Sequence, residues 1–198
     1  NDAFGILDAL EIDEAHIVGA SLGGMIAQTM AIERSKRVLS LTSIMSSTGS
    51  REVIDIPDDC LELLLAPAPT KRDEYLDYSA KYSIWCSKKY FDRDLAREYA
   101  AVEYDRSHYP EGSGRQIAAL LASGDREPLL ASLDVPTLVI HGSDDRLILP
   151  HQGERTAEVI PGAEYLLVND MGHDLPQALW PEVVDSIHSH LREATLTI

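Results

Sequence analysis

The 198-residue sequence has only two cysteines and no apolar run of the ~20 residues that a membrane helix needs. Its first residues also lack the basic stretch followed by an apolar one that is typical of a secretory signal. Cys60 and Cys86 have no metal-type spacing, which favours two reduced thiols over a disulfide. For the sequence as given, which begins at Asn1, we therefore expect a cytoplasmic protein without a membrane span.

Basic residues are also scarce. The chain has 17 Lys and Arg against 33 Asp and Glu, a formal net charge of −16. Proteins that follow nucleic-acid phosphates or bind anionic membranes carry an excess of positive charge, so we expect no nucleic-acid partner. The hydrophobic content of 44% is sufficient for a buried core, and we expect one globular domain with an insertion.

One short stretch carries most of the chemical information. The apolar residues His16 to Ala20 read as a strand that runs into the pattern Gly-x-Ser-x-Gly, and a helix-forming run follows at once. This order of strand, turn and helix is typical of a nucleophile elbow, in which Ser21 occupies a strained turn. Small neighbours permit such a turn, and the sequence supplies Gly19, Gly23 and Gly24. The backbone N–H of Leu22, at the start of the helix, is the candidate oxyanion donor.

The rest of the chain alternates between sheet-like and helical stretches. Buried strands are predicted at 16–20, 37–45, 135–142 and 164–169, and helices at 3–10, 152–159 and 181–192. This alternation predicts a parallel α/β core formed by residues 1–50 and 128–198. Residues 51–127 contain proline-broken helical segments and read as an inserted helical cap. The cap holds seven of the eight tyrosines, whose rings suit either helix packing or, as a group, the roof of an apolar pocket.

A serine nucleophile needs a base and an orienting acid, and both have candidates after the later strands. Asp144 and Asp145 follow the third predicted strand, at the end of the sheet where α/β proteins place active-site groups. His173 follows the last strand in a loop with Gly172. In contrast, His16 and His141 lie in predicted strands, His188 and His190 lie on the last predicted helix, and His151 starts another. No residue pattern indicates a metal or cofactor site.

These motifs resemble those of the α/β-hydrolase superfamily, serine esterase type. The matching segments are Gly19-Ala-Ser-Leu-Gly23, His141-Gly-Ser-Asp-Asp145 and Met171-Gly-His173. The resemblance implies a catalytic triad of Ser21, Asp145 and His173, and it places the acid at Asp145 rather than Asp144. More loosely, Gly172-His-Asp-Leu-Pro176 and the sequence around Arg115 resemble hydrolases related to aclacinomycin methylesterase.

The sequence departs from the family pattern at its start. In the family the elbow serine usually follows four strands, one of whose loops gives the second oxyanion donor, but here Ser21 is close to the first residue. We therefore expect four strands in sequential order, with 16–20 as an uncovered edge that invites association. Either an additional N-terminal segment of roughly 80 to 100 residues or a second copy of the chain would cover this edge.

The leading hypothesis is a serine hydrolase that cleaves a small, apolar carboxylic ester through an acyl-enzyme intermediate, without a cofactor. The same triad would also serve a cofactor-free perhydrolase, an acyltransferase or a C–C bond hydrolase. A different class of function is a non-catalytic relic that keeps the elbow and acts as a binding module.

Overall fold

The structure, a computed structural model, describes residues 2–52 and 54–197. Its centre is a parallel four-stranded sheet with the strands in sequential order, β1-β2-β3-β4. The strands are β1 (Ala15–Ala20), β2 (Val38–Ile44), β3 (Thr137–Gly142) and β4 (Glu164–Val168). The pairs run in register from Ala20 opposite Ile44 to Gly142 opposite Val168, so the carboxyl ends of all four strands lie at one end of the sheet. The predicted α/β class and strand order are confirmed.

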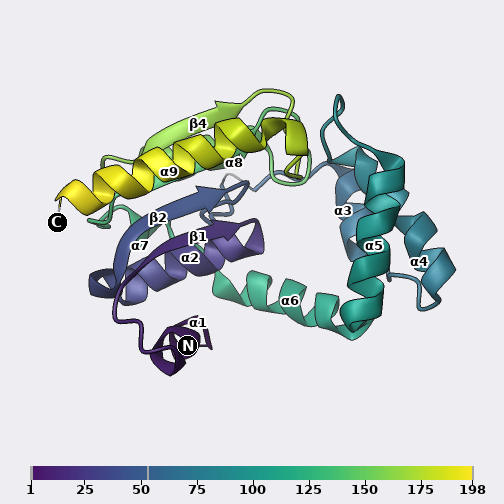
Figure 1. Cartoon of the computed structure of the whole chain (residues 1–198), viewed down its shortest axis with the longest axis horizontal. Coiled ribbons are helices and arrows are strands. Elements are labelled where there is room, and N and C mark those ends of the chain that lie inside the picture. Colours follow the sequence, from purple (N-terminus) through teal and green to yellow (C-terminus); the bar gives the residue numbers. More distant parts are fainter. Residues whose placement is uncertain (1, 53, 198) are drawn as a thin grey trace.

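Helices cover both faces of this sheet (Figure 1). The helices are α1 (Asp2–Ala9), α2 (Leu22–Glu33), α3 (Asp58–Leu65), α4 (Arg72–Tyr78), α5 (Arg93–Ser107), α6 (Pro110–Ser123), α7 (Glu127–Leu130), α8 (Pro150–Val159) and α9 (Trp180–Thr197). Short 3₁₀ turns occupy Ser35–Arg37, Ser79–Ile84 and Gln177–Leu179. Helices α2, α7 and α8 pack against one face, and α9 packs against the other.

Two apolar clusters hold these layers together. One joins α2 and α7 to β2 through residues such as Ala31, Leu41 and Leu130, and the other joins α9 to β2, β3 and β4 through residues such as Ile140 and Val183. Strands buried on both faces read as continuous apolar runs rather than alternating ones. For this reason β2 and β3 could be predicted from the sequence.

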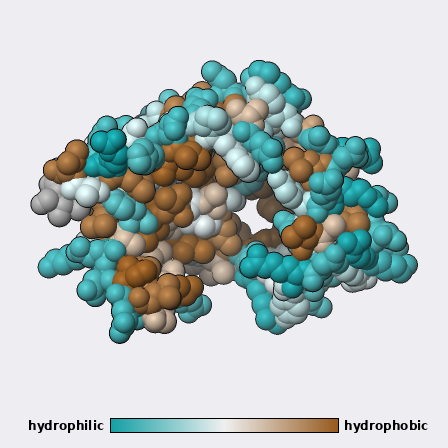
Figure 2. Space-filling model, in the orientation of Figure 1, coloured by the Kyte–Doolittle hydropathy of each residue, from teal (hydrophilic) through white to brown (hydrophobic). Residues whose placement is uncertain are grey.

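Strand β1 is an edge of the sheet, as predicted. Val18, at its middle, leaves 47% of its surface exposed, and Ile6 and Leu10 on the nearby N-terminal segment are exposed as well. Figure 2 shows apolar residues gathered over the sheet half of the molecule, whereas the opposite half is mostly hydrophilic. An apolar parallel edge of this kind is available for pairing with another segment.

Helices α3 to α6 lie between β2 and β3 in the chain, and α3, α4 and α5 stand beyond the carboxyl ends of the strands (Figure 1). Pro57 precedes the first residue of α3, and Pro110 is the first residue of α6. Proline is tolerated at the start of a helix because an N–H there would have no acceptor within the helix. Gly112 lies inside α6 and does not break it. The described residues of the stretch 51–127 contain no strand.

No helix in the described part of the chain is both long enough and apolar enough to cross a membrane. Cys60 and Cys86 are free thiols, and both are buried.

Candidate active site

Ser21 occupies the turn between β1 and α2. Its backbone has φ 54° and ψ −122°, a left-handed conformation that is strained for any residue other than glycine. Hydrogen bonds to neighbouring strands hold this turn: the Ser21 N–H donates to the Ile44 carbonyl at 2.9 Å, and the Ser46 hydroxyl donates to the Ser21 carbonyl at 2.9 Å. The Ser21 side chain makes no cap bond to α2, so its hydroxyl is free for other partners.

Only two of the three expected glycines are required by this turn. A Cβ at Gly19 would collide with the carbonyl of Gly23, and one at Gly24 would lie 2.6 Å from the Ser46 Cβ. A Cβ at Gly23 would meet nothing within 4 Å, so the expectation that all three positions need to lack a side chain was wrong for Gly23. Leu22 is the first residue of α2, and its N–H therefore has no acceptor within the helix.

Asp145 lies in the loop that follows β3 and is almost completely buried. One carboxylate oxygen accepts from the backbone N–H groups of Leu147 and Ile148, each at 2.9 Å. The neighbouring Asp144 points elsewhere: its carboxylate contacts the ammonium and the backbone N–H of Lys88.

His173 lies in the loop that follows β4. Gly142, at the end of β3, packs so closely against Met171 and Gly172 that a side chain there would collide with their backbone. The Asp144 N–H donates to the Met171 carbonyl at 2.8 Å, which ties the two loops together. Because β3 and β4 are adjacent, the loop that carries Asp145 (the acid loop, from its expected role) and the loop that carries His173 (the base loop) meet at one end of the sheet.

The structure brings the three side chains named from the sequence into one hydrogen-bonded line. His173 Nε2 lies 2.9 Å from the Ser21 Oγ, and His173 Nδ1 lies 2.7 Å from the Asp145 Oδ2. The imidazole is nearly buried, with 9% of its side chain exposed. This arrangement can move a proton from the serine hydroxyl to a histidine whose other nitrogen is held by a carboxylate.

The pKa of Asp145 is set by opposing effects. Burial acts to raise it, but hydrogen bonds from His141 and His173 outweigh burial and hold the pKa below its usual range. His141 is itself fully buried, with Nε2 at 3.4 Å from the Asp145 Oδ2 and 2.8 Å from the Ile148 carbonyl. Asp145 therefore remains ionised at neutral pH, as the orienting acid needs to be.

Residues 84–89, which belong to the stretch between β2 and β3, are hydrogen-bonded or ion-paired to the loops that follow β3 and β4; we call them the clamp segment. The backbone N–H of His173 donates to the Trp85 carbonyl at 2.7 Å. Arg146, in the acid loop, donates to the Ile84 carbonyl at 3.3 Å, and Lys89 pairs with Asp170 at 2.6 Å. The position of the imidazole therefore depends on the clamp segment as well as on the sheet.

Asp174 is a part of this attachment that the sequence did not single out. Its Oδ1 accepts from the Ser87 N–H at 2.9 Å and from the Gly172 N–H at 3.1 Å. Burial raises the pKa of Asp174, although these two N–H groups oppose the shift. Burial also raises the pKa of the adjacent Cys86 thiol to about 12, so Cys86 stays protonated and is no competing nucleophile.

Arg126 is a second residue that the sequence analysis missed. It is 5% exposed, and its guanidinium donates to the Gln28 Oε1 at 3.0 Å, the Ser47 carbonyl at 3.0 Å and the Ser123 hydroxyl at 2.8 Å. Its backbone N–H donates to the Thr48 carbonyl at 3.0 Å. Arg126 thus joins the loop that follows β2, on which the chain leaves the sheet, to the start of α7, on which it returns, and we call this cluster the latch.

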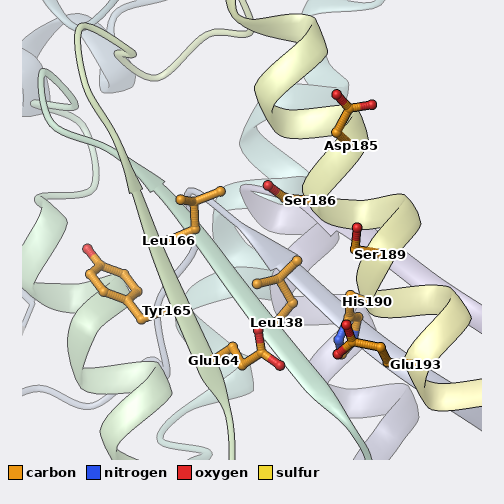
Figure 3. Close-up of a pocket in the computed structure, with 9 residues that line it drawn as sticks. All are labelled: Leu138, Glu164, Tyr165, Leu166, Asp185, Ser186, Ser189, His190 and Glu193. Atoms are coloured by element: carbon orange, nitrogen blue, oxygen red, sulfur yellow. The ribbon is translucent and has the colours of Figure 1, made fainter.

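A hollow of about 370 Å³ lies away from these residues, between α9 and strands β3 and β4 (Figure 3). Leu138 and Leu166 lie at its centre, and Tyr165 points to the other side of β4. Ser21, Asp145 and His173 do not line it, so this hollow is not the candidate active site.

The comparisons with known proteins agree with the fold. The family model described as the alpha/beta hydrolase fold matches residues 2–176, which is most of the chain. The chain belongs to the α/β hydrolase fold family. The looser resemblance to methylesterases is confirmed as well: the chain is 28% identical to rhodomycin D methylesterase DauP of Streptomyces sp. strain C5, over 98% of this chain and 72% of that protein.

Other members of the family with different names are about as similar. The 2-hydroxymuconate semialdehyde hydrolase of Pseudomonas sp. strain CF600 is 31% identical, over 86% of this chain and 59% of that protein. Among solved structures, an esterase of Thermogutta terrifontis superposes with a TM-score of 0.75 at 26% identity, covering 98% of this chain and 70% of that one. The chain thus spans about 60 to 70% of the length of these relatives.

Proposed function

We propose that the protein is a serine hydrolase that cleaves a small carboxylic ester, with Ser21 as nucleophile, His173 as base and acid, and Asp145 as orienting acid. The observation that carries this proposal is the hydrogen-bonded line from the Ser21 hydroxyl through His173 to Asp145. The methylesterase relative supports an ester as substrate.

In the proposed reaction the Ser21 Oγ attacks the ester carbonyl carbon while its proton passes to His173 Nε2. The carbonyl oxygen gains the negative charge and accepts a hydrogen bond from the Leu22 N–H. When the tetrahedral species collapses, His173 returns the proton to the departing alkoxide, which leaves as an alcohol. Water then attacks the acyl-enzyme with His173 again as base, and the carboxylic acid and free Ser21 are released.

We further propose that residues 51–127 act as a cap that forms part of the substrate pocket. Helices α3 to α5 stand beyond the end of the sheet where Ser21 lies, and Figure 2 shows the molecule hollowed between the two halves. The clamp segment gives this cap a direct attachment to the base loop. We propose a methyl ester as the substrate bound there, in keeping with the methylesterase relative.

The test is labelling by a fluorophosphonate probe together with turnover of a methyl ester. We expect Ser21 to be labelled, and Ser21→Ala to lose turnover by about a millionfold while keeping its circular dichroism spectrum. Labelling at another residue, or Ser21→Ala that keeps more than about a tenth of the activity, would contradict the assignment of the nucleophile. A folded chain that the probe never labels would favour the binding-module alternative.

A second candidate reaction is hydrolysis of a carbon–carbon bond. It is favoured by relatives such as the 2-hydroxymuconate semialdehyde hydrolase, which is 31% identical. Side-by-side assays with a methyl ester and with a vinylogous diketone would separate the two reactions. We expect the larger kcat/KM for the ester, and a larger value for the diketone would replace our proposal with this second one.

A further inference from the structure

The cap contains a hollow of about 260 Å³ where α4, α5 and the start of α6 meet. Three tyrosines and a histidine contribute to its wall, Tyr75, Tyr82, Tyr109 and His108, and Glu103 contributes a carboxylate. No lysine or arginine is among the described residues that line this hollow. It is large compared with the ~30 Å³ that one water molecule occupies in the liquid, so it can hold a small organic group.

The rings of this wall are fixed by one another. His108 stacks on Tyr104 with ring centroids 4.2 Å apart, and its ring meets Tyr75 edge-on at 5.0 Å. Tyr82 stacks on the buried Trp85 at 5.4 Å. A wall whose side chains are already held in place loses little conformational entropy when a ligand enters.

The charge of the wall is negative. The Tyr75 hydroxyl lies 3.4 Å from the Glu103 Oε2, and burial raises the pKa of both Tyr75 and Tyr82, so these hydroxyls stay neutral beside the carboxylate. The faces of aromatic rings attract cations, and a carboxylate at the same site adds to that attraction. Cations already lie over tyrosine rings of this cap: Lys81 over Tyr78 at 4.8 Å and Arg115 over Tyr109 at 5.4 Å.

We propose that this hollow is a binding site for a small organic cation, an ammonium group whose substituents contact Tyr75 and Tyr82 and whose charge is balanced by Glu103. Arg115 already covers one face of Tyr109, so Tyr75 and Tyr82 are the principal ring contacts. The proposal concerns binding in the cap and is independent of the reaction at Ser21.

A matched pair of ligands tests the role of the positive charge. Choline and 3,3-dimethylbutan-1-ol have the same shape, but a neutral carbon replaces the charged nitrogen in the second. We expect titration calorimetry or chemical-shift titration at constant ionic strength to give about tenfold tighter binding of choline, the size of a desolvated cation–π contact. Equal binding of the two, or no binding of choline up to tens of millimolar, would overturn the proposal.

Variants on one helix test the place of binding. Glu103→Gln is expected to weaken choline binding about tenfold, whereas Glu98→Gln, an exposed position on α5 outside the hollow, is expected to leave it unchanged. Equal weakening by both would indicate a general effect of the acidic surface and would contradict the site. Tyr82→Phe should bind like the wild type because it keeps the ring, and Tyr82→Leu should not. These titrations need no turnover, so their outcome is separate from that of the ester assay.

Discussion

The central strands and the cap helices differ in how much of their surface is buried. Strand β3 is buried at every position and β2 at all but one, whereas α5 buries only Ala100 and α6 has no buried residue. Ion pairs between exposed side chains, such as Arg72 with Asp105, link the cap helices to one another. Burial of apolar surface is the larger stabilising effect, and exposed ion pairs contribute about 1 kcal/mol or less each.

Besides the hydrogen bond from the Gln152 amide to the Asp55 carbonyl, two groups of buried or backbone hydrogen bonds attach residues 51–127 to the core. One is the latch around Arg126, where the chain leaves and re-enters the core, and the other is the clamp segment beside His173. Ser21 is thus held by the sheet, while the loops that carry Asp145 and His173 are held partly by the clamp segment. Substitutions in the sheet loops should therefore remove chemistry, and substitutions at the attachments should change stability or the mobility of the cap.

After the loss expected for Ser21→Ala, the largest effect is expected at the two adjacent carboxylates of the loop that follows β3. Asp145→Asn should lower kcat about ten-thousandfold, because an amide no longer holds the imidazole in the required tautomer. Asp144→Asn should lower it less than about tenfold, since it weakens only an exposed contact with Lys88. Steady-state assays of the two purified variants side by side give the comparison. The reverse order of the two losses would show that Asp144 is the acid.

The latch should affect stability more than chemistry. Removal of the buried guanidinium leaves the Gln28 Oε1 and the Ser47 carbonyl without this donor, although burial itself lowers the pKa of Arg126 and so opposes its charge. We expect the lost hydrogen bonds to dominate, and Arg126→Met to lower the free energy of unfolding by about 2 kcal/mol. Urea unfolding measures this free energy. The control is Arg93→Met at an exposed position, and its unfolding free energy is expected to lie within about 0.5 kcal/mol of the wild type. Equal midpoints for the two variants would contradict a structural role for the latch.

The two attachments also include residues whose roles could not be predicted from the sequence. Short apolar runs were enough to predict all four strands and their order, and in β2 and β3 these runs reflect burial on both faces of the sheet. Ser21, Asp145 and His173 could be named because each follows a strand at a typical position of the family. Arg126 could not, since its partner Gln28 is 98 residues away and no local pattern marks a single buried arginine among exposed ones. The role of Asp174 could not be predicted either, because its partner Ser87 is 87 residues away.

A smaller effect is expected at Asp174, and it depends on pH. Burial raises the folded-state pKa of this carboxyl, so just above the ordinary value of about 3.9 the folded protein holds a proton that the unfolded chain has lost. Its contribution to stability therefore falls as pH rises through that window and is constant above it. Asp174→Asn keeps an oxygen acceptor for Ser87 and Gly172 but has no charge to bury. We expect the stability of the variant relative to wild type to grow as pH rises from about 4 and then to level off.

Urea unfolding of both proteins at a series of pH values measures this difference directly, because the other carboxylates contribute equally to each. A difference that does not change with pH would mean that Asp174 is not destabilised by burial. As a control, Asp170→Asn, which removes an exposed carboxylate paired with Lys89, should not show the same rise with pH.

The smallest effect on the folded chain, but a clear one on association, is expected at the uncovered edge. We propose that two copies pair through β1, because it is an apolar edge strand and a two-fold dimer is the simplest closed arrangement for a self-complementary edge. Val18→Lys places a charge in the middle of this edge and should shift the mass measured by light scattering toward the 21.8 kDa monomer.

Leu167→Lys is the matched control, since Leu167 lies on β4 at the other edge of the sheet and is 43% exposed, against 47% for Val18. Both substitutions are at exposed positions and should change the unfolding free energy of the monomer by less than about 0.5 kcal/mol. A wild-type chain that is already monodisperse at the monomer mass would show that β1 does not pair with a second copy, and equal effects of the two lysines would show that pairing does not use β1.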